Sequence, residues 1–171
     1  MMKRAILVLF VAGLCVGCDQ VTKGIAREGL DDGRAISYMG DVLRLQLAEN
    51  HGGMLSFGSS LSGEHRFLIL TVFVAVALIG FFLFALLTKK MTTLQIISIS
   101  FVLGGGLGNL IDRLLNDGAV IDFLVIGIGS VRTAVFNLAD VAILLGAVVL
   151  LVARGKPSSP IDPILPQHQG P

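Results

Sequence analysis

The sequence contains few charged residues and no tryptophan. Only 15% of its 171 residues are charged, whereas a soluble domain carries nearer a quarter. Apolar residues make up 54% of the chain and the mean hydropathy is +0.85, so the composition indicates a membrane protein. With no Trp and one Tyr, the aromatic belt common at membrane interfaces is nearly missing. A net charge of +1, with no Arg/Lys cluster on a helix, excludes nucleic acid as a partner.

Proline is missing from most of the chain, because all five prolines lie between Pro157 and Pro171. Their concentration predicts a disordered cytoplasmic tail over residues 155–171 that takes no part in chemistry. We therefore expect one integral membrane domain over residues 1–154.

Cysteine and histidine are also scarce. Cys15 and Cys18 form a Cys-x-x-Cys pair, which elsewhere indicates redox or zinc chemistry, but no second pair accompanies them. The histidines, His51, His65 and His168, are too scattered for metal-ligand spacing. The sequence thus predicts no metal and no other cofactor, and Cys15 is interpreted as a small buried apolar residue.

Four apolar stretches predict an α-helical membrane protein with four transmembrane helices. At 1.5 Å per residue, 18 to 21 residues cross about 30 Å of hydrocarbon. The predicted spans are residues 5–25, 67–87, 94–111 and 136–153, and the first continues through Asp19 and Lys23.

Basic pairs flank alternate ends of these spans and indicate that both termini are cytoplasmic. The pairs are Lys3/Arg4, Lys89/Lys90 and Arg154/Lys156. Residues 27–66 then form a small extracytoplasmic platform, with a half-buried strand over 42–48. Residues 112–135 form a second extracytoplasmic loop, in which 120–128 also has strand character.

The polar groups of separate segments converge on this outer face. They end the first and third spans, follow the first strand and begin the fourth span: Asp19, Lys23, Asn50, Asn109, Asp112, Arg113, Asn137 and Asp140. Acids beside hydrocarbon are costly and usually functional. Two that meet can share a proton and activate water. Because apolar residues flank Asp122, we expect it to carry that proton, with Asp140 ionised at a helix start.

Each polar feature also has a purely structural interpretation. Asp19 and Lys23, spaced i, i+4, are interpretable as an interfacial ion pair. Arg113 is interpretable as a snorkelling cation, and the glycine run at 104–108 as helix packing. Asn137 and Asp140 fit a helix cap.

Read in order, five motifs resemble lipoprotein signal peptidase, the signal peptidase II family of bacterial membrane aspartyl peptidases. They cover residues 15–145 and read Asp19-Gln-Val-Thr-Lys23, Asn50-His-Gly52-Gly-Met-Leu-Ser56, Gly104-Gly-Gly-Leu-Gly-Asn109-Leu-Ile-Asp112-Arg113, Val120-Ile-Asp122-Phe and Phe136-Asn137-Leu-Ala139-Asp140. Any one of these motifs is weak evidence for the family, whereas five motifs in the same order on four spans are specific evidence.

The resemblance implies a four-helix enzyme of the bacterial inner membrane with a periplasmic β-cradle and a periplasmic active site. It implies an aspartic endopeptidase that removes signal peptides from diacylglyceryl-modified prolipoproteins just before the lipidated cysteine, without a metal. It makes Asp122 and Asp140 the catalytic pair. The supporting or substrate-binding positions are then Asp19, Lys23, Asn50, Gly52, Gly105, Asn109, Arg113, Asn137 and Ala139. Its partners are lipidated prolipoproteins and membrane lipid, and we expect a monomer.

The chain departs from the family pattern at His51 and at Met54-Leu55, where the family has small or aromatic residues. Two other functions stay open on the sequence alone. Val16-Gly17-Cys18 after a basic and apolar start resembles a lipoprotein signal, which would make Cys18 lipidated and residues 1–17 removed. The second alternative is a polytopic membrane protein for binding or transport, whose intramembrane acids carry protons or ions. Secondary transporters are commonly built from inverted repeats, and the sequence shows no internal repeat.

Overall fold

A computed structural model describes residues 2–30, 33–53 and 61–153 of the chain. The predicted tail and the Met54-Leu55 departure lie outside these residues. The helices are α1 (Met2–Leu30), α2 (Gly63–Arg66), the π-helix η2 (Phe67–Phe73), α3 (Val74–Leu87), α4 (Thr93–Leu115) and α5 (Leu138–Ala153). Helices α2, η2 and α3 form one continuous helical stretch.

Within the described residues, three helical stretches are long and apolar enough to cross a membrane: Met2–Leu30, Gly63–Leu87 and Thr93–Leu115. Helix α5 is apolar but shorter, with 16 residues. Three stretches extend beyond the predicted spans: α1 continues past residue 25 to Leu30, the second stretch begins at Gly63 and not at 67, and α4 continues past residue 111 to Leu115. Helix α5 begins at Leu138, two residues after the predicted start.

At the ends of α1 and α4, Ala26 and Leu30 of α1 pack in an apolar cluster with Phe123, and Asp112 of α4 pairs with the buried Lys23. Contacts with distant segments therefore extend both helices past the predicted ends.

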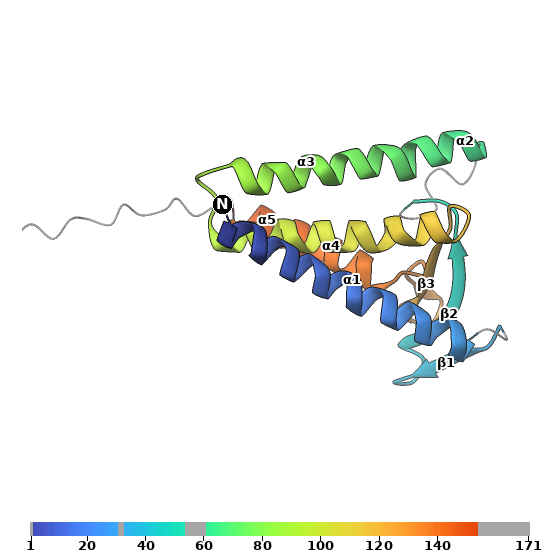
Figure 1. The fold of residues 1–171 in the computed structure, drawn as a ribbon. Helices are drawn as coiled ribbons and strands as arrows, with labels where there is room; N and C mark the ends of the chain where they lie inside the picture. The colour runs from blue at the N-terminus through green and yellow to red at the C-terminus, as the bar shows by residue number, and fades with distance from the viewer. Residues whose placement is uncertain (1, 31–32, 54–60, 154–171) are drawn as a thin grey trace, which may run out of the picture.

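Helix α4 lies at the centre of the bundle and packs against α1, α3 and α5 (Figure 1). Its glycines make this possible. A Cβ on Gly104 would lie 2.5 Å from the Cβ of Cys15 in α1, and one on Gly106 would lie 2.6 Å from a methyl group of Leu78 in α3. The glycine run therefore brings neighbouring helices into close contact, as small residues do in membranes.

Gly105 makes the corresponding contact with α5. A Cβ there would collide with the carbonyl oxygen of Ala139 and lie 2.8 Å from Ile143. We predict that Gly105→Ala lowers the free energy of unfolding by about 1–3 kcal/mol, the usual cost of overpacking. Gly80→Ala is the matched control, because nothing lies within 4 Å of its Cβ. Thermal unfolding in detergent measures both, and equal stability of the two variants would contradict the prediction.

The two connections outside the helices join into one sheet with the order β1-β2-β3-β4. The strands are β1 (Ala35–Tyr38), β2 (Leu43–Asn50), β3 (Val120–Ile128) and β4 (Val131–Arg132), all antiparallel. The two strands expected from the sequence are thus confirmed, while β1 and β4 were not predicted. The sheet lies at the end of the helices opposite the N-terminus (Figure 1).

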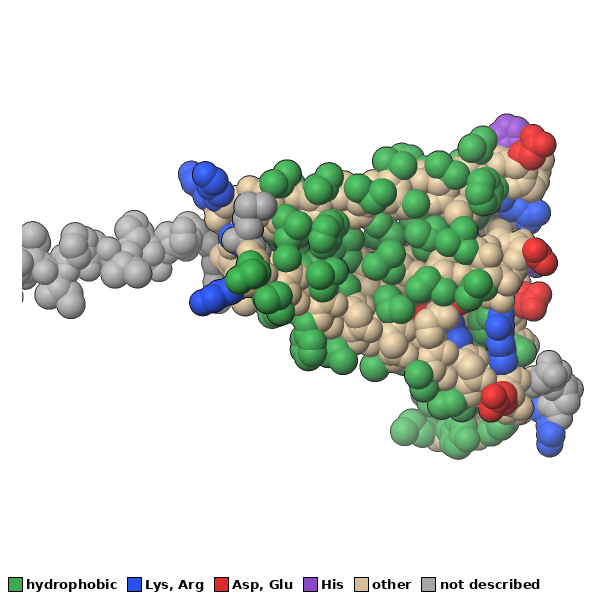
Figure 2. All heavy atoms as spheres, in the orientation of Figure 1, with side chains coloured by type: hydrophobic (Ala, Val, Ile, Leu, Met, Phe, Trp, Pro, Cys, Tyr) green, Lys and Arg blue, Asp and Glu red, His purple; other side chains and the backbone are tan. Residues whose placement is uncertain are grey.

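The types of side chain on the surface also differ between the helices and the sheet end of the molecule. Figure 2 shows hydrophobic side chains over the helices, Lys and Arg near the N-terminal end, and charges of both signs near the sheet. The described residues form two buried apolar clusters. The larger lies among α1, α3 and α4 and includes Val8, Leu78 and Ile99, and the smaller joins the end of α1 to Phe123 of β3. The buried charged residues, Asp19, Lys23, Asp112 and Asp122, lie closer to the sheet.

Candidate active site

Asp19 and Lys23 form a buried ion pair at the inner side of α1. The Lys23 Nζ lies 2.7 Å from Asp19 Oδ2 and 2.9 Å from Asp112 Oδ2 on α4. All three side chains are nearly inaccessible to solvent. The other Asp19 oxygen accepts a hydrogen bond of 2.9 Å from the backbone N–H of Ala139. The pair is therefore part of the packing of α1 against α4 and α5, not an interfacial pair facing lipid.

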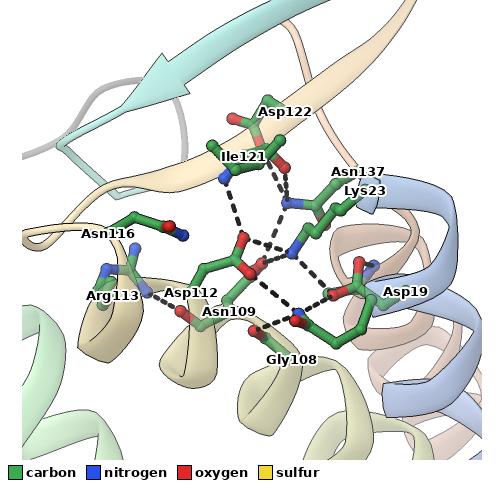
Figure 3. Close-up of polar contacts among 12 residues, drawn as sticks. Asp19, Lys23, Gly108, Asn109, Asp112, Arg113, Asn116, Ile121, Asp122 and Asn137 are labelled. Carbon is green, nitrogen blue, oxygen red and sulfur yellow. Dashed lines mark hydrogen bonds and ion pairs between the residues drawn. The ribbon is translucent and has the colours of Figure 1, made fainter. Parts of the chain in front are cut away.

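The sequence analysis placed Asp112 among the polar groups that converge on the outer face but gave it no role in the site. One carboxylate oxygen accepts from the backbone N–H of Ile121 at 2.9 Å, and the other accepts from the Gln20 amide at 2.9 Å. Asp112 thus fixes β3 at the residue before Asp122 (Figure 3). The available signal was its position one helical turn after Asn109. The role of Gln20 had no signal in the sequence.

Asn137 connects the two predicted catalytic aspartates. Its side-chain N–H donates to Asp122 Oδ1 at 2.7 Å, and its backbone N–H donates to Asp140 Oδ2 at 3.3 Å. The backbone N–H of Asp140 donates in return to Asn137 Oδ1 at 2.9 Å. The helix cap proposed as a structural interpretation is therefore present, and the same residue also joins the two carboxylates.

Asn109 links this pair to the buried cation. Its amide N–H donates to Asp140 Oδ1 at 2.9 Å, while its oxygen accepts from Lys23 at 3.1 Å and from Asn137 at 3.0 Å. Figure 3 shows Lys23, Asn109 and Asn137 directed toward one another below β3. Side chains from α1, α4, β3 and the start of α5 thus meet in one network.

The residues after β2 complete the other side of Asp122. The Asn50 amide donates to Asp122 Oδ2 at 3.0 Å, and its oxygen accepts from Gly52 N–H at 2.9 Å. Arg113 donates to the Gly52 carbonyl oxygen at 3.1 Å. The carboxylates of Asp140 and Asp122 lie close enough to Arg113 to interact with its charge. His51 is exposed.

The environment of Asp122 favours its protonated form. The side chain is 1% exposed, and burial is the main cause that raises its pKa from 3.8 to about 6. The negative charge of Asp140 raises this pKa further, whereas hydrogen bonds from Asn50 and Asn137 and the charge of Lys23 oppose the rise. Asp140 is only half-buried. The two carboxylates therefore lie in different environments, which suits an acid and a base.

Within the described ranges, no group of three or more His, Cys, Asp or Glu side chains is placed to hold a metal ion.

Two observations define the class: apolar helices long enough to cross a bilayer, and two linked carboxylates of which one is buried and the other half-buried. The protein is a helical membrane protein with an acidic site. The family model for signal peptidase (SPase) II matches residues 11–154. The chain therefore belongs to the signal peptidase II family.

Similar proteins include the lipoprotein signal peptidase of Hydrogenovibrio crunogenus, 39% identical, where the match covers 88% of this chain and 86% of that protein. The lipoprotein signal peptidase of Leifsonia xyli is 36% identical over 88% of this chain and 69% of its own length. A solved structure described as a bacterial membrane enzyme superposes with a TM-score of 0.75 at 27% identity, covering 88% of this chain and 94% of that one.

Proposed function

We propose that this protein is an aspartyl endopeptidase that removes signal peptides from diacylglyceryl-modified prolipoproteins, cutting just before the lipidated cysteine. Asp122 and Asp140 are the residues that activate water. The observation that carries this assignment is the double contact of Asn137, which holds one oxygen of each carboxylate. One amide in contact with both groups keeps them at the same place in the fold.

The two carboxylates divide the acid and base work. Asp140 starts ionised and accepts a proton from the water that attacks the scissile carbonyl. Asp122 starts protonated and donates a proton to the departing amine, so that no covalent intermediate forms. Asn50, Asn109 and Asn137 fix the orientation of the carboxylates, and Lys23 compensates the surrounding negative charge.

The test is the conversion of a purified lipidated precursor by the wild-type protein in detergent or vesicles. A gel shift, together with a product mass that begins at the lipidated cysteine, supports the proposal. Proton or ion flux through the reconstituted protein without any cleavage would favour the transport alternative instead.

Activity is expected to depend on the protonation of Asp122. The pKa of about 6 means that kcat/KM falls as pH rises through about 6, because the general acid loses its proton. Asn50→Ala removes a hydrogen bond that lowers this pKa, so it should move the falling limb to higher pH, whatever its effect on the maximal rate. A pH profile of kcat/KM for both proteins measures this. A limb that stays in place would contradict the assignment.

The α1 helix supports retention of the N-terminus. Val8 and Ala12 belong to the buried core, and Asp19 and Lys23 on the same helix belong to the site network. Removal of residues 1–17 would expose the facing apolar side chains of α3 and α4. The interpretation in which Cys18 is lipidated and the preceding residues are lost is therefore not favoured.

We place the protein in the bacterial inner membrane with four spans, both termini cytoplasmic and the sheet and site on the periplasmic side. Basic side chains at the N-terminal end of the bundle support this orientation (Figure 2). The sheet also presents an apolar face. Tyr38, Leu43 and Ile126 are cross-strand partners, so their side chains lie on one face of the sheet. Asp122 lies on the same face, because it is four residues before Ile126 on β3 and side chains alternate along a strand.

We predict that this apolar face rests on bilayer lipid. Ile128, at the end of β3, is 78% exposed. Because the chain has no Trp, Ile128→Trp provides a single fluorescent reporter, which brominated phospholipids should quench strongly. Glu49→Trp, an exposed position on the opposite face of β2, is the control and should be quenched weakly. Equal quenching of the two would show that the face does not contact lipid.

A further inference from the structure

A groove of about 350 Å³ lies between α1 and α3, with α4 as its floor. Val8 of α1, Leu78 of α3 and Leu103 of α4 are buried along it, and every side chain that lines it is apolar. Leu9 and Ile79 form its two rims, and they are 61% and 60% exposed on the surface of the membrane helices. The mechanism above makes no use of this groove.

The groove is open because small residues lie along it. Ala12 and Ala75 line it at positions where a longer side chain would fill the space. Leu78 packs closely on Gly106 of α4, so it lies deep in the groove and not across the opening. A helix is about 10 Å across and would need roughly 800 Å³ over a length of about 10 Å. The groove therefore suits a single acyl chain better than a helix.

The end of the molecule near the N-terminus carries positive charges without acidic partners. The Arg4 guanidinium donates to the carbonyl oxygen of Lys89 at 3.0 Å and thereby ties the start of α1 to the loop after α3. Lys3, Lys89 and Lys90 are exposed at this junction (Figure 2). All acidic residues that the structure describes lie in the half of the molecule nearer the sheet. The junction is therefore suited to an anionic group.

The groove lies at the depth that an acyl chain reaches from these charges. At 1.5 Å per residue, Val8 lies about 6 Å along α1 from Arg4, and Phe82 lies about 10 Å along α3 from Lys89. Ala75 lies about 10 Å further along α3. The hydrocarbon of one leaflet is about 15 Å thick, half of the bilayer core. A lipid with its headgroup at the basic junction therefore extends an acyl chain through the groove.

We propose that the groove holds one acyl chain of an anionic phospholipid, whose phosphate binds Lys3, Lys89 and Lys90. The lysines select the charge of the headgroup, because no acidic residue opposes them. The groove selects the chain, since a polar group would lose its water there without gaining a partner. The basic junction and the carboxylate pair lie at opposite ends of the helices, so this lipid is a component of the bilayer and not the substrate.

The experiment measures which lipid lies at the groove. Because the chain has no Trp, Leu9→Trp places a single fluorophore on the rim. The protein is reconstituted in equimolar phosphatidylcholine and phosphatidylglycerol, with bromine on the acyl chains of one or the other. Quenching should indicate a preference for phosphatidylglycerol of about fivefold, roughly the contribution of one lysine beside anionic lipid. Leu144→Trp, exposed on α5 and outside the groove, should show no preference.

The contribution of the headgroup is tested in the Leu9→Trp protein with the double variant Lys89→Gln/Lys90→Gln. The preference should fall toward one, because two of the three exposed lysines at the junction are lost. Arg27→Gln/Arg34→Gln is the matched control. It removes the same charge from exposed positions near the sheet and should keep the preference.

The contribution of the groove is tested in the same protein with Ala75→Phe, which fills the space from α3. This variant should also lower the preference toward one, although every lysine is retained. Val76→Phe is its control, because Val76 is 61% exposed and does not line the groove; the preference should be kept.

Equal quenching by the two lipids at Leu9→Trp would overturn the proposal, as would a preference that survives in Lys89→Gln/Lys90→Gln or in Ala75→Phe. A preference that Arg27→Gln/Arg34→Gln also removes would reflect net charge alone and would overturn it too. Two other occupants would be recognised in the same assay. Quenching that disappears as the ratio of protein to lipid rises would assign the groove to a second copy of the chain. Quenching lost on addition of a lipidated precursor would assign it to the signal peptide. Either result would overturn the lipid site.

Discussion

Asp122→Asn and Asp140→Asn are each expected to lower precursor cleavage by at least about 10² to 10⁴, the contribution of a general acid or base. Asparagine keeps the shape of the side chain but neither accepts a proton from water nor donates one to an amine. Because Asp122 and Asp140 depend on the same contacts with Asn137, loss of either should disable the pair. Both variants should remain folded and inserted, since no backbone is displaced.

Initial rates of processing of a lipidated precursor measure this effect. Glu28→Gln is the charge-matched control, because Glu28 is exposed on α1 and lies outside the network; it should process at the wild-type rate. Size-exclusion profiles in detergent should be the same for all four proteins. Substantial cleavage by either aspartate variant would remove that residue from the mechanism.

The sequence predicted the apolar helices and the two longest strands because these depend on local pattern. Runs of apolar residues of the right length specify membrane helices. Val120–Ile128 forms a strand in the structure, as its composition predicted. Strand β1 is only four residues long, Ala35–Tyr38, and all four are exposed, so its sequence is too short to indicate a strand.

The ends of α1 and the connections within the site were not predictable in the same way. One hydrogen bond of the site joins Asp19 to the backbone N–H of Ala139, 120 positions away in the chain. Another joins Gln20 to Asp112, 92 positions away. Local reasoning ended the first span near residue 25, before Arg27 and Glu28, but α1 continues to Leu30. There Ala26 and Leu30 pack against Phe123, which is almost a hundred positions away, and no local pattern shows that contact. The role of Asp112 in holding Ile121 likewise depends on the pairing of α4 with β3.

Lys23 should be the residue whose loss most weakens the fold. Lys23→Met is predicted to lower the free energy of unfolding by about 3–5 kcal/mol, the cost of leaving a buried charge uncompensated. Asp19 and Asp112 would then face each other in a nearly solvent-free interior without the cation that lies within 2.9 Å of both. Denaturation in detergent, followed by circular dichroism, measures the change.

Two further variants separate charge from packing. Lys90→Met, at an exposed position, should change stability little. Adding Asp19→Asn and Asp112→Asn to Lys23→Met removes the remaining charges, so it should recover part of the lost stability. If Lys23→Met were as stable as Lys90→Met, the ion cluster would not hold α1 to α4. If it were unstable and the triple variant equally so, packing of the lysine chain, and not its charge, would be the cause.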